Sequence, residues 1–123
     1  MEMEEKRLGT VEARFADIVW ENQPISSGKL VELCKEKLGW KKSTTYTVLK
    51  KLSLRGLFCN EGGVVKAVVT RDQFYSMQSQ QFVNEMFDGS LPSFIAAFTS
   101  GKSLDKEELE KIKRMIDEAF TKE

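Results

Sequence analysis

The chain has 123 residues, of which 41% are hydrophobic and 31% charged, so it has room for one globular domain or a small domain with a helical appendage. It contains no histidine and two cysteines, which excludes His-based acid–base catalysis, Ser-His-Asp triads and an all-cysteine zinc site. The longest unbroken apolar run, residues 94–98, is too short to span a bilayer, and the charged start of the chain is not a secretory signal, so we expect a cytoplasmic protein without metal or cofactor.

Charge is distributed unevenly along the chain although its formal net charge is zero. Residues 35–71 hold nine Lys and Arg against two Asp and Glu, a net charge of +7. A concentrated positive patch favours a polyanionic partner that is met by one face of the molecule. A solvated basic surface would give the same count, so charge alone leaves both interpretations open.

Two helices are predicted in the first forty residues. Thr10 is a candidate cap for the first helix, which should end before Pro24 because proline disfavours helical angles at the residue preceding it. Ser26 or Ser27 can cap the second helix, and Gly39 suits a left-handed stop after it.

A third helix is predicted over residues 42–55, with Gly56 ending it. Its inward stripe has apolar-leaning residues at helical spacing: Thr45, Val48, Leu49 and Leu52. The opposite face carries small hydroxyls, a tyrosine and lysines: Ser43, Thr44, Tyr46, Thr47, Lys50 and Lys51. These side chains can contact phosphates and base edges in a major groove, although a helix start rich in Ser and Thr is also an ordinary cap.

Two strand-like runs, residues 57–59 and 64–69, flank a segment with two glycines and therefore predict a hairpin. The tight turn between the second and third helices is typical of a helix-turn-helix unit. In the hairpin only Lys66 is basic and the tip contains Glu61, so we expect a supporting contact to DNA at most.

Three further helices are predicted after Thr70, with Pro92 in the first turn of the second and Asp105 capping the last. They carry more large apolar groups than one thin layer can hide, so we expect a homodimer interface, although packing onto the first three helices is the alternative. The interface candidates are Phe74, Met77, Phe82, Met86, Phe94, Phe98, Ile112 and Ile116.

Residues 39–52, with Trp40 at the start and Gly56 beyond the end, resemble the recognition-helix signature of the penicillinase repressor family, and the likeness extends from about Leu8 to Phe120. The resemblance implies a mainly α fold with a small β wing. In that fold, residues 1–71 form a winged helix-turn-helix domain and residues 72–123 a helical dimerisation domain.

The resemblance also implies function. It implies a transcriptional repressor that binds a palindromic double-stranded DNA operator as a homodimer through nine residues: Lys41, Lys42, Ser43, Thr44, Tyr46, Thr47, Lys50, Lys51 and Lys66. In the antibiotic-responsive branch a membrane sensor protease system triggers cleavage, and the matching bond here joins Ala97 and Phe98. The copper-responsive branch has a C-terminal cysteine cluster, and this chain has no cysteine after Cys59.

Two other functions compete with repression. A winged helix that binds protein in place of DNA fits the neutral balance of charge and the acidic wing tip. An enzyme is disfavoured because the sequence has no paired carboxylates in an apolar setting. Cys34 and Cys59 are expected to be small hydrophobic residues, with redox sensing as the alternative.

Overall fold

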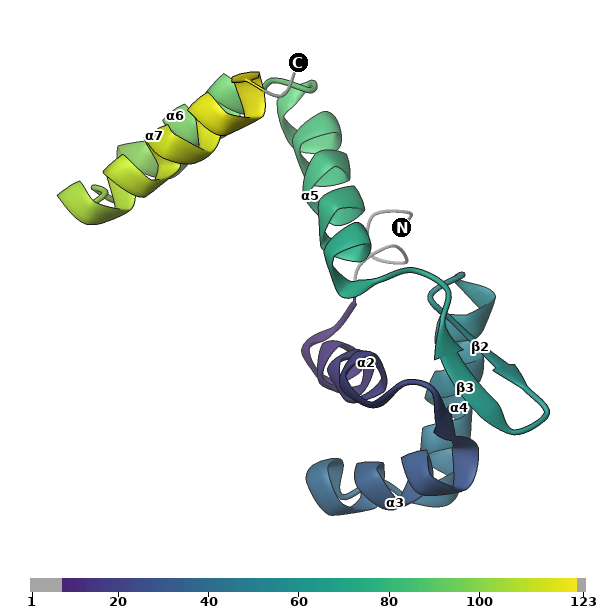
Figure 1. The fold of residues 1–123 in the computed structure, drawn as a ribbon. Helices are drawn as coiled ribbons and strands as arrows, with labels where there is room; N and C mark the ends of the chain where they lie inside the picture. The colour runs from purple at the N-terminus through teal and green to yellow at the C-terminus, as the bar shows by residue number, and fades with distance from the viewer. Residues whose placement is uncertain (1–7, 122–123) are drawn as a thin grey trace. The chain divides into compact units, whose positions relative to one another are not determined.

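The structure, a computed structural model, describes residues 8–121, with side chains through residue 119. In chain order the elements are α2 (Thr10–Asn22), β1 (Ile25–Ser26), α3 (Ser27–Leu38), α4 (Lys42–Leu54), β2 (Phe58–Glu61), β3 (Val64–Ala67), α5 (Arg71–Phe87), α6 (Leu91–Gly101) and α7 (Lys106–Thr121) (Figure 1). The mainly helical fold with a small β wing is confirmed. The chain divides into two compact units, an N-terminal unit that ends at Ser79 and a C-terminal unit that begins at Gln80, so α5 runs through the boundary.

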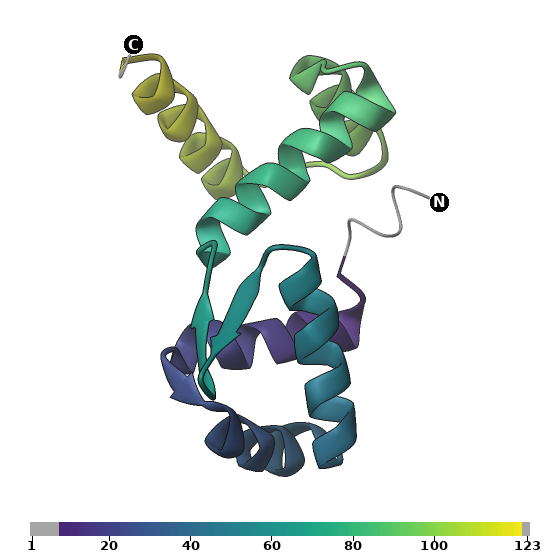
Figure 2. The ribbon, with the colours of Figure 1, turned by 90° about the vertical axis from the view of Figure 1, so that its right-hand side faces the viewer.

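In the N-terminal unit, α2, α3 and α4 surround one apolar core and the β2–β3 hairpin closes one side of it (Figure 2). The largest fully buried side chains come from all of these elements: Phe15, Val19, Leu30, Cys34, Thr45, Leu52, Phe58 and Val65. The three helices therefore bury their apolar stripes against one another and against the hairpin, which is the arrangement of a winged helix.

The ends of α2 and α3 follow the sequence in all but one detail. The Ser26 hydroxyl accepts a hydrogen bond from the Lys29 N–H at 3.2 Å, and Gly39 ends α3 with φ at 70°. The prediction that Thr10 caps α2 is wrong, because Gly9 is the N-cap residue. The Glu12 carboxylate accepts the Gly9 N–H at 3.0 Å and supplies the capping interaction in place of a threonine hydroxyl.

The sheet has three strands in the order β1-β3-β2, all antiparallel. Gly62 and Gly63 turn the hairpin with φ of 59° and 81°, a left-handed conformation that glycine adopts without strain. The strand β1 was not predicted, since two residues carry no detectable alternation. Its pairing of Ile25 with Val65 and of Ser26 with Val64 ties the start of α3 to the wing.

Aromatic rings fix how the helices meet in this core. The ring of Trp40, in the turn before α4, stacks on Phe15 at 5.5 Å between centroids. Trp20 contacts Phe58 at 5.6 Å and Phe74 at 5.7 Å. Phe74 is only 3% exposed, so the expectation that it lies at a dimer interface is corrected: it closes the core of its own chain.

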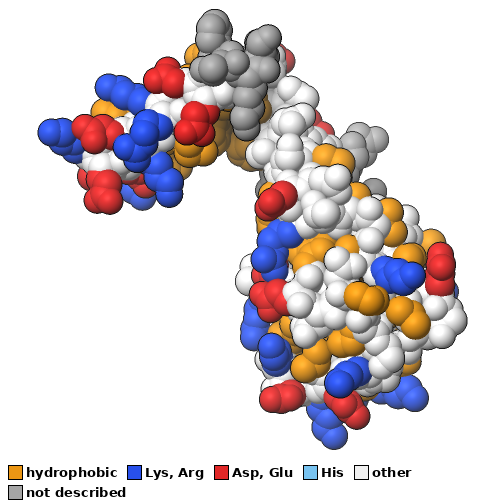
Figure 3. All heavy atoms as spheres, viewed as in Figure 1, with side chains coloured by type: hydrophobic (Ala, Val, Ile, Leu, Met, Phe, Trp, Pro, Cys, Tyr) orange, Lys and Arg blue, Asp and Glu red, His pale blue; other side chains and the backbone are white. Residues whose placement is uncertain are grey.

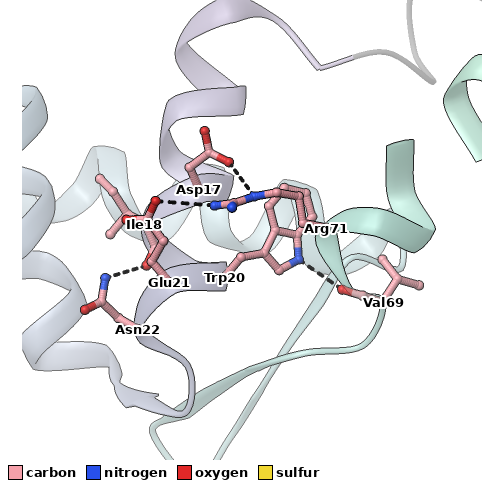
Figure 4. Close-up of polar contacts among 7 residues, drawn as sticks. All are labelled: Asp17, Ile18, Trp20, Glu21, Asn22, Val69 and Arg71. Atoms are coloured by element: carbon pink, nitrogen blue, oxygen red, sulfur yellow. Dashed lines mark hydrogen bonds and ion pairs between the residues drawn. The ribbon is translucent and has the colours of Figure 1, made fainter. Parts of the chain in front are cut away.

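The start of α5 is held to α2 by Arg71 (Figure 4). Its Nε lies 3.1 Å from Asp17 Oδ1 and its Nη2 lies 3.4 Å from Glu21 Oε1, while the guanidinium stands 5.8 Å from the centre of the Trp20 ring. The Trp20 Nε1–H in turn donates to the Val69 carbonyl at 3.0 Å. The carboxylates of Asp17 and Glu21 and the indole of Trp20 therefore fix the segment that joins β3 to α5.

The C-terminal unit is built differently, because no side chain described between residues 80 and 119 is fully buried. Pro92 lies in the first turn of α6 and Asp105 accepts from the Glu108 N–H at 2.7 Å, as the sequence predicts. The cap of α6 was not predicted: the Ser90 hydroxyl accepts from the Ser93 N–H at 3.1 Å. Four of its aromatic rings contact one another, those of Phe82, Phe87, Phe94 and Phe98. This unit has helices with apolar faces but no core of its own.

An ion pair joins α2 to α4 on the surface of the N-terminal unit. Lys51 Nζ lies 2.7 Å from Glu12 Oε2, and the Glu12 side chain is 19% exposed. Burial tends to raise the pKa of the Glu12 carboxyl, but hydrogen bonds from Lys51 and the Gly9 amide, with the charges of Lys51 and Arg55, outweigh burial and lower it.

We expect Glu12→Gln to lower the free energy of unfolding at neutral pH by about 1 kcal/mol, because the capping and ionic roles of the carboxylate weaken together. The lowered pKa means that this stabilisation is complete above the ordinary carboxyl value of 4.5 and is lost as pH falls through the folded-state value. Urea unfolding between pH 7 and pH 3 measures this. A difference between the two proteins that stays constant over that range would contradict the assignment.

Candidate nucleic-acid interface

The helix α4 has one face in the core and one in solvent. Thr45, Leu49 and Leu52 are buried at helical spacing, and Val48 packs beside them. The Thr45 hydroxyl donates to the Lys41 carbonyl at 3.4 Å, so this polar side chain is hydrogen-bonded inside the core. Burial of this face fixes which side chains the helix presents outward.

The buried face of α4 meets Cys34 of α3. Burial raises the pKa of the Cys34 thiol although a hydrogen bond with Thr45 acts to lower it. A thiol with a raised pKa is protonated at neutral pH and unreactive, which fits the expected role as a small core residue. Cys59 is half-buried in β2, and both cysteines are free thiols.

The outward face of α4 carries most of the residues that the sequence proposes for DNA contact. Each of the following is exposed: Lys41, Lys42, Ser43, Thr44, Thr47, Lys50 and Lys51. At 100° per residue, Ser43, Thr47 and Lys50 form a single stripe opposite the buried face. Leu54 continues this stripe and is 80% exposed, although the sequence analysis did not single it out.

Two residues of this set differ from the expectation. Tyr46 is half-buried against the core, and its hydroxyl donates to the Ser27 hydroxyl at 3.0 Å, so it is not a free group on the outward face. Lys51 is engaged with Glu12, so its charge is partly neutralised within the chain. Lys50 has no such partner in the described part of the chain and projects a full positive charge.

The wing carries little positive charge for contact with phosphate. Lys66 is exposed on β3, opposite Cys59 of β2, while the exposed Glu61 adjoins the turn. The α4 face and Lys66 belong to the same compact unit, which brings residues from two parts of the sequence into one candidate interface.

The other candidate residues lie on α5, α6 and α7. Met77 is exposed in the N-terminal unit. In the C-terminal unit Phe94 and Ile112 are half-buried, whereas Phe82, Met86, Phe98 and Ile116 are between 36% and 60% exposed. Figure 3 shows hydrophobic side chains gathered along one edge of the segment formed by α6 and α7, beside Lys, Arg, Asp and Glu side chains. Ala97 and Phe98 are exposed on α6.

Among the residues that the structure describes, no group of three or more Cys, Asp or Glu is placed to hold a metal ion. None of the described helices combines the length and the apolar composition needed to cross a bilayer.

Comparison with known proteins agrees with this geometry. The model of the penicillinase repressor family matches residues 8–118. The penicillinase repressor of Bacillus licheniformis is 21% identical over 116 residues, 91% of each chain. The methicillin resistance regulatory protein MecI of Staphylococcus aureus strain Mu50 is 19% identical over 114 residues, 89% of this chain and 93% of MecI. Since the family model spans both compact units, this chain belongs to the penicillinase repressor family.

Proposed function

We propose that this transcriptional repressor binds operator DNA as a homodimer, with the exposed face of α4 in the major groove of each half-site. The observation that carries the proposal is the stripe of Ser43, Thr47 and Lys50, held outward because the opposite face of α4 is buried. The Ser43 hydroxyl and the Lys50 ammonium group can meet base edges and phosphates there. The Thr47 hydroxyl donates to the Ser43 carbonyl at 2.8 Å, so this side chain offers its oxygen as an acceptor and its methyl group to thymine methyl groups.

The start of α4 is suited to the phosphate backbone. Lys41, its N-cap residue, is exposed, so its ammonium group can reach an external anion. The positive end of the helix dipole and the charges of Lys41 and Lys42 attract a phosphate to this point. Small side chains at Ser43 and Thr44 allow the backbone to approach it closely.

In a dimer the second subunit would contact the second half-site of the operator. The support for a dimer is that the C-terminal unit has no buried core of its own. Exposed apolar residues occur on each of its helices: Phe82, Met86, Leu91, Ile95, Phe98, Leu109, Met115 and Ile116. A second copy of the same unit offers a matching apolar surface, and two-fold pairing is the commonest way to cover one. Two α4 helices would then meet half-sites about one helical turn, or a multiple, apart.

A gel shift of the chain on DNA from its own promoter, at two salt concentrations, tests DNA binding and separates the roles of two lysines. We expect Lys50→Ala to weaken binding and to reduce the slope of log K against log salt by about one, because one phosphate contact is lost. Lys51→Ala should have the smaller effect, because Lys51 is paired with Glu12.

Both variants should keep the helical circular dichroism of the parent, which controls for folding. Equal affinity of Lys50→Ala and the parent would contradict the assignment of α4. Failure of the parent to retard any promoter fragment, together with capture of a protein partner, would favour the alternative of a protein-binding winged helix.

The dimer surface is tested by Ile116→Asp, which introduces a charge at a side chain that is 60% exposed. Such a change is nearly neutral on the surface of a monomer, but it dissociates a dimer that buries this position. Arg114→Ser, on the opposite side of α7, changes the net charge by the same amount and is the matched control. Sedimentation should give a monomer for Ile116→Asp and a dimer for the control; a dimer for both would exclude Ile116 from the interface.

We further propose that cleavage between Ala97 and Phe98 ends repression. Both residues are exposed, and no residue of α6 is buried, so local opening of this helix meets little resistance from packing. The cut would separate α7, with the apolar stripe of Leu109, Ile112 and Ile116, from the unit that carries α4. Half of the proposed dimer surface would leave with it.

A chain that ends at Ala97 mimics the product of that cleavage. We expect it to sediment as a monomer and to bind the operator about 100-fold more weakly, because the advantage of two linked half-site contacts is lost. The thermal unfolding of its N-terminal unit serves as the folding control, since the core of that unit lies within residues 8–79. Retention of parental operator affinity would show that α7 is dispensable and would overturn this proposal.

A further inference from the structure

A chain of two hydrogen bonds links α4, the start of α3 and the turn of the wing. The Tyr46 hydroxyl donates to the Ser27 hydroxyl at 3.0 Å. The backbone N–H of Ser27 donates to the carbonyl of Gly63 at 2.8 Å. Ser27 therefore stands between the recognition helix and the turn of the β2–β3 hairpin, and Tyr46 is the residue of α4 that reaches it.

We propose that Tyr46 is a positioning residue that sets the wing relative to α4, and this proposal rests on the proposed DNA binding. Through Ser27, its hydroxyl fixes the distance between the stripe of Thr47 and Lys50 and the wing residue Lys66. The α4 stripe and Lys66 can then contact a duplex at the same time. No binding free energy is lost in bringing them to the right separation.

The packing around Ser27 supports this role. A Cβ atom added to Gly63 would lie 3.9 Å from the Ser27 hydroxyl, so that hydroxyl lies directly over the turn. The pairing of Ser26 with Val64 fixes the neighbouring residue to the same strand. The body of Tyr46 is held against the core, so its hydroxyl cannot swing far from Ser27. Tyr46 therefore adds a polar link between the turn and α4 to the apolar packing of the core.

The hydroxyl of Tyr46 already has a partner within the chain, which argues against a direct phosphate contact. It lies 3.0 Å from the Ser27 hydroxyl, at hydrogen-bond distance. A contact to phosphate would compete with that bond, whereas a positioning role requires it to remain.

The test is a double-mutant cycle on operator binding by the full chain. Tyr46→Phe removes only the hydroxyl and should weaken binding about fivefold, the range expected for one neutral hydrogen bond. Ser27→Ala should reproduce that loss, and the two changes together should cost no more than either alone.

In a Lys66→Ala background, where the wing has lost its cation, Tyr46→Phe should cost less than about twofold. Tyr75→Phe, at the second tyrosine of the chain, should leave the affinity unchanged.

Two binding results would overturn the proposal. One is full affinity of Tyr46→Phe. The other is a loss in Tyr46→Phe that Ser27→Ala does not share and that is undiminished in the Lys66→Ala background, which would identify Tyr46 as a direct DNA contact.

A second measurement keeps the outcome separate from the proposed function. Hydrogen exchange of the Ser27 amide, measured without DNA, should be several-fold faster in Tyr46→Phe, because Ser27 is then held less firmly against the Gly63 carbonyl. Unchanged exchange would overturn the link between α4 and the turn. If the parent binds no DNA, the proposed function fails by itself, and the exchange rates still decide whether Tyr46 controls the wing.

Discussion

Burial of one face of α4 is the constraint on which the candidate interface depends. Leu49 and Leu52 anchor the helix in the core, and Thr45 joins them because its hydroxyl is satisfied by a backbone carbonyl one turn earlier. Because this face is anchored, α4 cannot rotate about its own axis. The side chains of Ser43, Thr47 and Lys50 are thereby held outward before any partner arrives, which lowers the entropic cost of binding.

The positive charge that this surface presents depends on which of its cations are paired within the chain, and not only on their number. The window of residues 35–71 has a net charge of +7, but its cations differ in their surroundings. Lys51 is paired with Glu12, and Arg71 with Asp17 and Glu21, so two of the basic groups serve the fold. Lys41, Lys42 and Lys50 are exposed at the start and on the outer side of α4. The start and outer side of α4 therefore present three exposed lysines, while the wing contributes only Lys66.

The two units reach stability by different routes. The N-terminal unit has a continuous core with aromatic contacts among Phe15, Trp20, Phe58 and Phe74. The C-terminal unit buries no described side chain, and its apolar residues are spread over separate helices. We propose that such a unit gains its hydrophobic stabilisation by association, which would couple folding of the proposed dimer surface to protein concentration. That coupling would give a repressor a point of control away from α4.

The sequence by itself determined most of the order and most of the ends of the elements, because these are local properties. Helical spacing, the caps at Ser26 and Asp105, Pro92 in the first turn of α6 and the glycines of the hairpin act over a few residues and can be read in one dimension. The outward and inward faces of α4 followed from the same periodicity, except at Tyr46.

Only the tertiary structure decided which exposed-looking residues have partners within the chain. The positions of Tyr46, Lys51 and Phe74 depend on Ser27, Glu12 and Trp20, which are 19, 39 and 54 residues away in sequence. The two-residue strand β1 likewise exists only because β3 lies beside it. Contacts between distant residues leave no periodic trace in a single sequence, so packing assigned these roles where pattern could not.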